Sequence, residues 1–191
     1  GYQIERVKLG YGYSIVTAKN SQGEHKLYGC GSNEDGQLGL GDRDKVTQFE
    51  ALPIVLDEGY QIERVECGEY HTIALAKNAQ GDQKLYGCGW NISDQLGSGD
   101  RVSVKQFEES TINLAEGYQI ERVECGCIYT IVTAKNSQGE HKLYGCGHNY
   151  YGQLGLGDRD EIKQFEELPF REQILKRLVE KERQEECSYN P

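Results

Sequence analysis

The chain has 191 residues, and its 21 Lys and Arg against 31 Asp and Glu give a formal net charge of −10 at pH 7. This acidic balance argues against nucleic-acid binding, which needs clustered cations. It suits a soluble protein, or one whose partner has a basic surface. No apolar run approaches the roughly 20 residues of a membrane span, and no signal peptide opens the chain. The sequence contains no Met, so we expect that residue 1 is not the natural start.

Internal repetition is the strongest signal in the sequence. The heptapeptide Gly-Tyr-Gln-Ile-Glu-Arg-Val begins at residues 1, 59 and 117, a spacing of 58 residues. Lys-Leu-Tyr-Gly-Cys-Gly recurs at the same spacing from residues 26, 84 and 142. Repeats of this length are typical of arrays in which neighbouring units share a core. We therefore predict repeat 1 at 1–58, repeat 2 at 59–116, repeat 3 at 117–168, and a C-terminal helix and tail at 169–191.

Within the second repeat, four segments have the character of short β-strands. Residues 62–67 are β-branched and partly alternating, and residues 71–77 form a second strand before the turn at 78–81. Residues 84–88 and 106–109 supply the third and fourth strands. Four short antiparallel strands per repeat are typical of a propeller blade. The predicted fold is all-β, a partial β-propeller of three four-stranded blades in an open arc with a C-terminal capping α-helix.

The two ends of the array carry separate predictions. Pro169 opens a helical pattern in which Phe170, Ile174 and Leu178 recur at every fourth position. This helix is interpreted as a lid on the last repeat, with a partner-binding helix as the alternative. At the N-terminal side, an open arc exposes a strand edge and apolar area. We expect self-association or missing upstream blades there.

The cysteines recur with the repeat rather than pairing within it. Cys30, Cys88 and Cys146 are 58 residues apart, and so are Cys67 and Cys125. We interpret them as free thiols, small and buried, in a reducing intracellular compartment, the cytoplasm or the nucleus. Metal binding is not expected, because the only close pair, Cys125 and Cys127, lacks accompanying His ligands. No cofactor and no catalytic residue are predicted.

Positions that differ among such similar repeats indicate where function resides. One variable cluster precedes the second predicted strand (residues 11–13, 69–71 and 127–129), and another follows the third (32–35, 90–93 and 148–151). A hairpin joins these strands, so both clusters lie at one end of each blade, called the loop face below. The other end carries the nearly constant turns 20–23, 78–81 and 136–139, called the turn face.

We predict that the loop face binds a protein partner, because it is rich in the aromatic residues that interfaces favour. Neutral drift of exposed loops is the alternative explanation. The predicted partner-binding residues are Tyr11, Tyr13, Glu34, Asp35, Glu69, Tyr70, His71, Trp90, Tyr129, His148, Tyr150 and Tyr151.

The repeat itself resembles a known family. A strand ending in Cys67-Gly68 is followed by His71-Thr72 and by a hairpin into Leu-Tyr-Gly-Cys-Gly-x-Asn-x-x-x-Gln-Leu-Gly-x-Gly-Asp from Leu85. This pattern resembles the repeat of the regulator-of-chromosome-condensation family over residues 1 to about 169. Two features depart from it: Cys occupies the position where the family usually has Trp before the Gly-x-Asn turn, and three blades cannot close the seven-bladed ring that complete members resemble.

The resemblance implies a role in nucleotide exchange on small GTPases. In the founding member, acidic and His side chains on the loop that matches 69–71 contact the GTPase Ran and promote nucleotide release. Such exchange has no covalent step. The inserted wedge hairpin and the basic arm of the founding member have no counterpart here, and Tyr11, Glu69 and Cys127 replace the stacked Trp residues of photoreceptor members. The leading hypothesis is a binder or exchange factor for a small Ras-superfamily GTPase such as Ran. The alternative is a scaffold or substrate-recruiting module of a larger protein, as in some large ubiquitin ligases.

Overall fold

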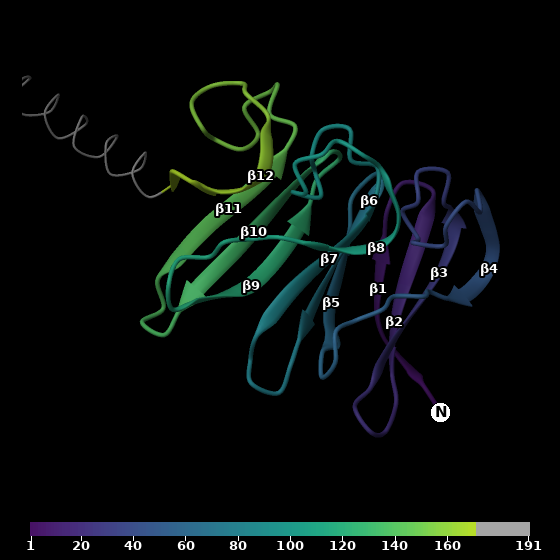
Figure 1. The fold of residues 1–191 in the computed structure, drawn as a ribbon. Helices are drawn as coiled ribbons and strands as arrows, with labels where there is room; N and C mark the ends of the chain where they lie inside the picture. The colour runs from purple at the N-terminus through teal and green to yellow at the C-terminus, as the bar shows by residue number, and fades with distance from the viewer. Residues whose placement is uncertain (171–191) are drawn as a thin grey trace, which may run out of the picture.

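The computed structural model describes residues 1–170, which form three four-stranded antiparallel sheets side by side in an open arc (Figure 1). Each sheet is one blade, and its strands follow the order of the chain. Blade 1 contains β1 (Gln3–Leu9), β2 (Tyr13–Lys19), β3 (His25–Ser32) and β4 (Lys45–Ala51). Blade 2 contains β5 (Gln61–Cys67), β6 (His71–Lys77), β7 (Gln83–Gly89) and β8 (Val104–Ser110). Blade 3 contains β9 (Tyr118–Cys125), β10 (Tyr129–Asn136), β11 (His141–Gly147) and β12 (Ile162–Leu168).

These sheets confirm the predicted all-β partial propeller and its four strands per repeat. The third strand of blade 2 runs one residue further than predicted, to Gly89, and the fourth begins two residues earlier, at Val104. The pairing between them is irregular from Gly87 to Gly89, and Gly89 has a φ of 106°. A Cβ at Gly89 would lie 2.3 Å from the carbonyl oxygen of Tyr70, so only glycine fits there. The predicted C-terminal helix lies almost wholly outside the described residues.

The hairpin turns explain why each blade forms locally. The side-chain oxygen of Asn78 accepts hydrogen bonds from the backbone nitrogens of Gln80 and Asp82, at 3.0 and 2.8 Å. The same asparagine geometry recurs from Asn20 and Asn136 in the other two blades. Asparagine favours such turns because its side chain can replace a backbone partner. This turn joins β6 to β7 and sets the register of the hairpin that they form, in which His71 lies opposite Gly89.

The core lies between the blades rather than inside a single sheet. Ile62 and Val65 of β5 are buried against Ile15 and Leu27 of blade 1. The corresponding β9 residues of blade 3 pack in the same way against blade 2. The strands β1, β5 and β9 contact one another in sequence along the inner side of the arc (Figure 1). Each blade therefore depends on its neighbour to bury its apolar surface, as expected for a repeat array.

The six described cysteines are free thiols. Cys88 and Cys146 are fully buried, and burial raises the pKa of both thiols well above the usual range. Cys30, Cys67 and Cys125 are half-buried, and Cys127 is exposed. Within residues 1–170, no helix has the length and apolar character needed to cross a membrane.

Candidate functional site

The two variable clusters of each repeat meet at the loop face. In blade 2, the backbone nitrogen of Trp90 after β7 donates to the carbonyl oxygen of Tyr70 before β6, at 2.8 Å. The matching bonds in the other blades join Ser32 to Gly12 at 2.8 Å and His148 to Ile128 at 3.0 Å. The hairpin register holds the loops together because the start of the second strand pairs with the end of the third. Each blade thus presents two linked variable loops.

The loop faces of the three blades also contact one another. The rings of Tyr11 and Tyr70 meet edge to face, with centroids 5.8 Å apart. The backbone nitrogen of Tyr11 donates to the carbonyl oxygen of Glu69 at 3.3 Å. On the other side of blade 2, the thiol of Cys127 donates to the carboxylate of Glu69. Glu69 therefore lies at the centre of a continuous surface that begins in blade 1 and ends in blade 3.

Glu69 is held in its ionised form. Hydrogen bonds from the Cys127 thiol and the Tyr70 hydroxyl lower the pKa of this carboxyl group. The same interaction with Glu69 raises the pKa of Tyr70 to about 12, and burial together with Glu69 raises that of Cys127 to about 11. At neutral pH the loop face therefore carries a fixed negative charge beside two neutral hydrogen-bond donors.

Exposed aromatic side chains are concentrated at the blade 3 end of the loop face. Tyr150 and Tyr151 are 57% and 83% exposed, and their rings meet edge to face with centroids 5.1 Å apart. His148 lies beside both tyrosines, and the guanidinium of Arg159 lies over the Tyr150 ring at 5.7 Å. Trp90 in blade 2 is 36% exposed. Side chains of this kind supply large contact areas in protein interfaces.

Two further predicted acids lie in blade 1. Glu34 is exposed and Asp35 is half-buried. Burial raises the pKa of Asp35, while Lys105 of blade 2 opposes that shift. The ammonium group of Lys105 donates to the carbonyl oxygen of Glu34 at 2.5 Å, so this acidic loop is tied to the next blade.

Two of the predicted partner-binding residues lie inside the junctions between blades. The Tyr13 side chain is 3% exposed, and its hydroxyl donates to the carbonyl oxygen of His71 at 2.6 Å. The His71 side chain is fully buried, with Nε2 3.0 Å from the Thr130 hydroxyl of blade 3. Neither side chain can reach a partner on the loop face. The prediction that Tyr13 and His71 contact a partner is therefore wrong, and both residues are structural links between blades. Tyr129, their counterpart in blade 3, is half-buried.

A glycine three residues earlier in the sequence explains why the Tyr13 and His71 side chains point into the junctions. The residue three positions earlier is glycine in each repeat: Gly10, Gly68 and Gly126. A Cβ at Gly68 would lie 2.2 Å from Cε1 of the His71 ring, so the ring occupies space that only glycine leaves free. The pattern Gly-x-x-Tyr/His was therefore a signal for a junction residue.

A second set of junction contacts was missed by sequence reasoning. The hydroxyl of Thr72 donates to the carbonyl oxygen of Gln37 in blade 1 at 2.7 Å. Its counterpart Thr130 donates to the carbonyl oxygen of Gln95 in blade 2, also at 2.7 Å. Both threonines are fully buried. The sequence shows that these threonines recur at the repeat spacing, but a threonine within a strand does not by itself indicate a contact with the neighbouring blade.

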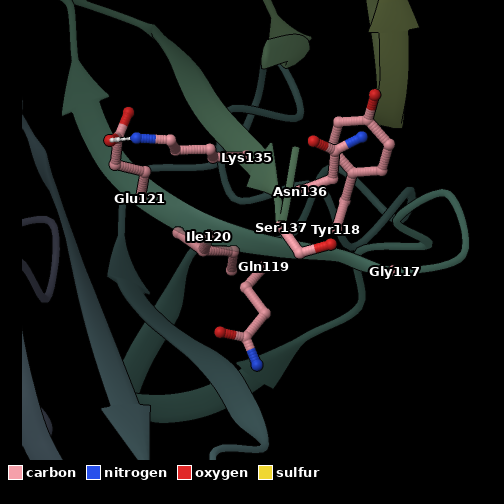
Figure 2. Close-up of a pocket in the computed structure, with 8 residues that line it drawn as sticks. All are labelled: Gly117, Tyr118, Gln119, Ile120, Glu121, Lys135, Asn136 and Ser137. Carbon is pink, nitrogen blue, oxygen red and sulfur yellow. Dashed lines mark ion pairs between the residues drawn. The ribbon is translucent and has the colours of Figure 1, made fainter. Parts of the chain in front are cut away.

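The turn face offers less chemistry than the loop face. Figure 2 shows the open groove beside the blade 3 turn, lined by residues 117–121 and 135–137. Its charged pair joins Lys135 to Glu121 at 3.8 Å, and His141 lies 3.2 Å from the same carboxylate. A similar groove in blade 1 is lined by the matching residues. No group of three potential metal ligands occurs among residues 1–170.

Comparisons with known sequences identify the repeat. Residues 24–75 match the model of the regulator of chromosome condensation (RCC1) repeat. The chain is 32% identical over 163 residues to the ultraviolet-B receptor UVR8 of Arabidopsis thaliana, covering 84% of this chain and 33% of the receptor. It is 33% identical over 130 residues to the secretion-regulating guanine nucleotide exchange factor of Bos taurus, covering 68% and 26%. It is 27% identical over 157 residues to the probable E3 ubiquitin-protein ligase HERC6 of Homo sapiens, covering 82% and 14%. The chain thus spans a third or less of the length of these relatives.

Comparisons with solved structures agree on the fold. Human WBSCR16 superposes with a TM-score of 0.68 and 23% identity, covering 86% of this chain and 40% of that one. Prp20p of Saccharomyces cerevisiae superposes with a TM-score of 0.64 and 19% identity, covering 86% and 38%. The matched repeat model, the recurring Gly-x-Asn turns and the sequence similarity to the relatives named above lead to one conclusion about the family. The chain belongs to the family of proteins built from regulator of chromosome condensation (RCC1) repeats.

Proposed function

We propose that the loop face binds a small Ras-superfamily GTPase, such as a Ran-like protein, and acts as an exchange factor or as a binder. The observation that carries the proposal is the ionised Glu69 between Tyr11, Tyr70 and Cys127, where the three blades meet. Aromatic contact area and a central acid suit a protein partner with a basic surface. The net charge of −10 favours the same kind of partner.

Nucleotide exchange would need no chemistry beyond binding. An exchange factor accelerates release because it binds the nucleotide-free GTPase more tightly than the nucleotide-bound form. A carboxylate directed at the nucleotide site of the GTPase would weaken its contacts with phosphate and magnesium by charge repulsion. Glu69 is the acid best placed for that role, whereas His71 is buried and cannot take part.

Two relatives support a GTPase as the partner. The bovine relative is named a guanine nucleotide exchange factor, and the study of Prp20p describes its binding to Gsp1p and histones. These properties belong to those proteins, and they supply the class of partner to be tested for this chain.

A second candidate function is a scaffold that recruits substrates for a larger protein without exchange activity. The similarity to HERC6, named a probable E3 ubiquitin-protein ligase, favours this candidate. The same loop face would serve as the recruiting surface. The two candidates differ in the partner and in the effect on bound nucleotide.

Release of fluorescent GDP from a panel of purified small GTPases, Ran included, tests the proposal. Measurements run with and without the chain, and Glu69→Lys serves as the loop-face variant and Gln80→Ala as the turn-face control. We expect at least one GTPase to bind or to release GDP faster, with loss in Glu69→Lys and no loss in Gln80→Ala. Absence of binding and of acceleration across the panel would reject the GTPase and leave the scaffold function.

A further inference from the structure

The loop between β7 and β8 of blade 2 combines three unusual features. It comprises residues 90–103, and we call it the Trp90 loop. Blade 2 lies between blades 1 and 3 (Figure 1), so both neighbouring blades are already in place around this loop. The exposure of its side chains is therefore a property of the array itself.

The first feature is a set of exposed apolar side chains. Trp90, Ile92 and Val102 are 36%, 47% and 59% exposed. The matching positions of blade 1 are polar or acidic: Ser32, Glu34 and Asp44. The backbone nitrogen of Asn91 donates to the hydroxyl of Ser103 at 3.4 Å, so the two ends of the loop lie together. Exposed apolar side chains gathered on one loop mark an interaction site.

The second feature is a buried amide group without a partner. Gln95 is fully buried, its amide oxygen accepts a hydrogen bond from the backbone nitrogen of Ser93, and Nε2 has no hydrogen-bond partner among residues 1–170. In blades 1 and 3 the matching amide nitrogen is paired, with Ser32 Oγ at 3.3 Å from Gln37 and with His148 Nδ1 at 2.9 Å from Gln153. Trp90 occupies the position of these two partners, and its ring nitrogen can only donate. An unpaired buried donor costs free energy, which an acceptor from a binding partner recovers.

The third feature is strained backbone. Asp94 and Arg101 have φ values of 59° and 52°, and among residues 1–170 they are the two non-glycine residues with positive φ. Their side chains are joined, because Nε of Arg101 donates to the carboxylate of Asp94 at 2.9 Å. Backbone strain persists only where the surrounding structure holds it, and it is concentrated at functional sites. The strain, the unpaired amide and the exposed apolar side chains thus coincide in one loop.

The charges around the Trp90 loop indicate what kind of segment it accepts. The backbone nitrogen of Trp90 donates to the carbonyl oxygen of Tyr70, which brings Glu69 beside the loop. Asp100 lies within the loop and is exposed. Neither Glu69 nor Asp100 forms an ion pair among residues 1–170, whereas Arg101 is already paired with two carboxylates. The loop therefore favours an occupant that carries positive charge.

We infer that the Trp90 loop binds an extended partner segment in which an apolar side chain lies next to Lys or Arg. The apolar side chain packs on the exposed apolar side chains of the loop, and the cation lies against Glu69 or Asp100. Because Gln95 is buried, the Trp90 ring shifts on binding, and a backbone carbonyl of the segment then accepts the hydrogen bond from Gln95 Nε2. The inference rests on the proposed binding role of the loop face, and it adds the chemistry of the partner segment for a GTPase and for a recruited substrate alike.

Nuclear magnetic resonance of the isotope-labelled full chain tests the inference. Trp90 is the only Trp of the chain, so its indole N–H gives a single resonance that reports this loop. The probe is the acetylated and amidated peptide Gly-Lys-Leu-Lys-Gly. Two matched peptides, Gly-Glu-Leu-Glu-Gly and Gly-Lys-Ser-Lys-Gly, change the charge and the apolar side chain separately. We expect the probe to shift the Trp90 indole and Gln95 side-chain amide resonances saturably, with an affinity several-fold higher than that of either matched peptide.

Two variants at the same position of their repeats, Gln95→Met and Gln37→Met, form a matched pair. Gln95→Met removes the unpaired donor and should weaken binding of the probe several-fold, whereas Gln37→Met should bind it as the unmodified chain does. Trp90→His introduces the residue that partners the glutamine amide in blade 3, and it should abolish binding. Circular dichroism checks that each variant folds. Trp90→His, followed through the Gln95 amide resonance, replaces Gln95→Met if the latter fails to fold.

The possible outcomes separate this inference from the proposed function. The inference is overturned if the probe causes no saturable shift, if the three peptides bind equally, or if the Gln95 amide resonance does not move. Equal binding by Gln95→Met and Gln37→Met also overturns it. A GTPase of the panel that binds the chain when the probe does not would leave the proposed function standing without this subsite. Binding of the probe without binding of any GTPase would support the subsite and reject the GTPase.

Discussion

The hydroxyl of Tyr13 in blade 1 donates a 2.6 Å hydrogen bond to the carbonyl oxygen of His71 in blade 2, one repeat further along the chain. His71 occupies the same position in its own repeat and lies 3.0 Å from Thr130 of blade 3. One recurring position therefore links successive blades. The residue type at this position differs between blades 1 and 2, but in both blades the side chain points toward the following blade.

Removing the Tyr13 hydroxyl tests the first of these links. We expect Tyr13→Phe to lower the free energy of unfolding by about 1–3 kcal/mol, because the buried hydrogen bond from the Tyr13 hydroxyl to the His71 carbonyl is lost. Urea unfolding followed by circular dichroism measures the change. Tyr151→Phe, at an 83% exposed position, should leave the midpoint unchanged. Equal midpoints for both variants would show that the Tyr13 bond does not hold the junction.

The second link should make stability depend on pH. Thr130 donates its proton to Gln95, so the proton between the ring and Thr130 belongs to Nε2 of His71. Nδ1 of His71 has no hydrogen-bond partner among residues 1–170, and burial lowers the pKa of His71 from 6.5 to about 4. The unfolded chain therefore binds a proton at a higher pH than the folded chain does.

Stability should accordingly fall as the pH falls from 6.5 to 4, by up to about 3 kcal/mol from His71. His71→Tyr introduces the residue that the other two repeats carry, and it should remove this part of the pH dependence. Urea unfolding of both proteins at several pH values measures the difference. Parallel stability profiles for the two proteins would contradict the buried neutral histidine.

A backbone position that differs between repeats gives a third prediction. Asp94 has a φ of 59°, where Gly36 and Gly152 occupy the matching positions at 86° and 73°. Its buried carboxylate accepts a 2.9 Å hydrogen bond from Arg101. Asp94→Ala should be less stable than Asp94→Gly by about 1 kcal/mol, because both lose the Arg101 pair but only alanine keeps the strained backbone. Thermal unfolding of the two variants ranks them, and the reverse order would show that the backbone is unstrained.

The sequence predicted the blades well and the loop face less well. Repetition at a fixed spacing identified strands and turns, because the same turn residues recur in the same places. The directions of Tyr13 and His71 could not be inferred in this way, because an alternating strand shows which residues share a side but not which side meets the next blade. Glu69 was identified, whereas its bond with Cys127 joins blades that only the fold brings together.

Glu69 should control how quickly a partner associates. Glu69→Lys reverses a charge at the centre of the loop face, so we expect slower association and the opposite dependence on salt concentration. Stopped-flow kinetics of association with a small GTPase that binds the chain, measured at several ionic strengths, test both effects. Glu124→Lys, which changes the net charge equally on an inner strand, separates the local effect from that of net charge. If the two variants had the same association rate and salt dependence, Glu69 would act only through the net charge of the chain.

We propose that the loop face, and not the turn face, binds the partner. Isothermal titration of a small GTPase selected from the panel, with Trp90→Ala, Tyr151→Ala and the turn-face control Gln80→Ala, tests it most directly. We expect each aromatic substitution to weaken binding by about 1–3 kcal/mol, whereas Gln80→Ala should leave the affinity unchanged. Equal affinities for all three variants and the unmodified chain would contradict it.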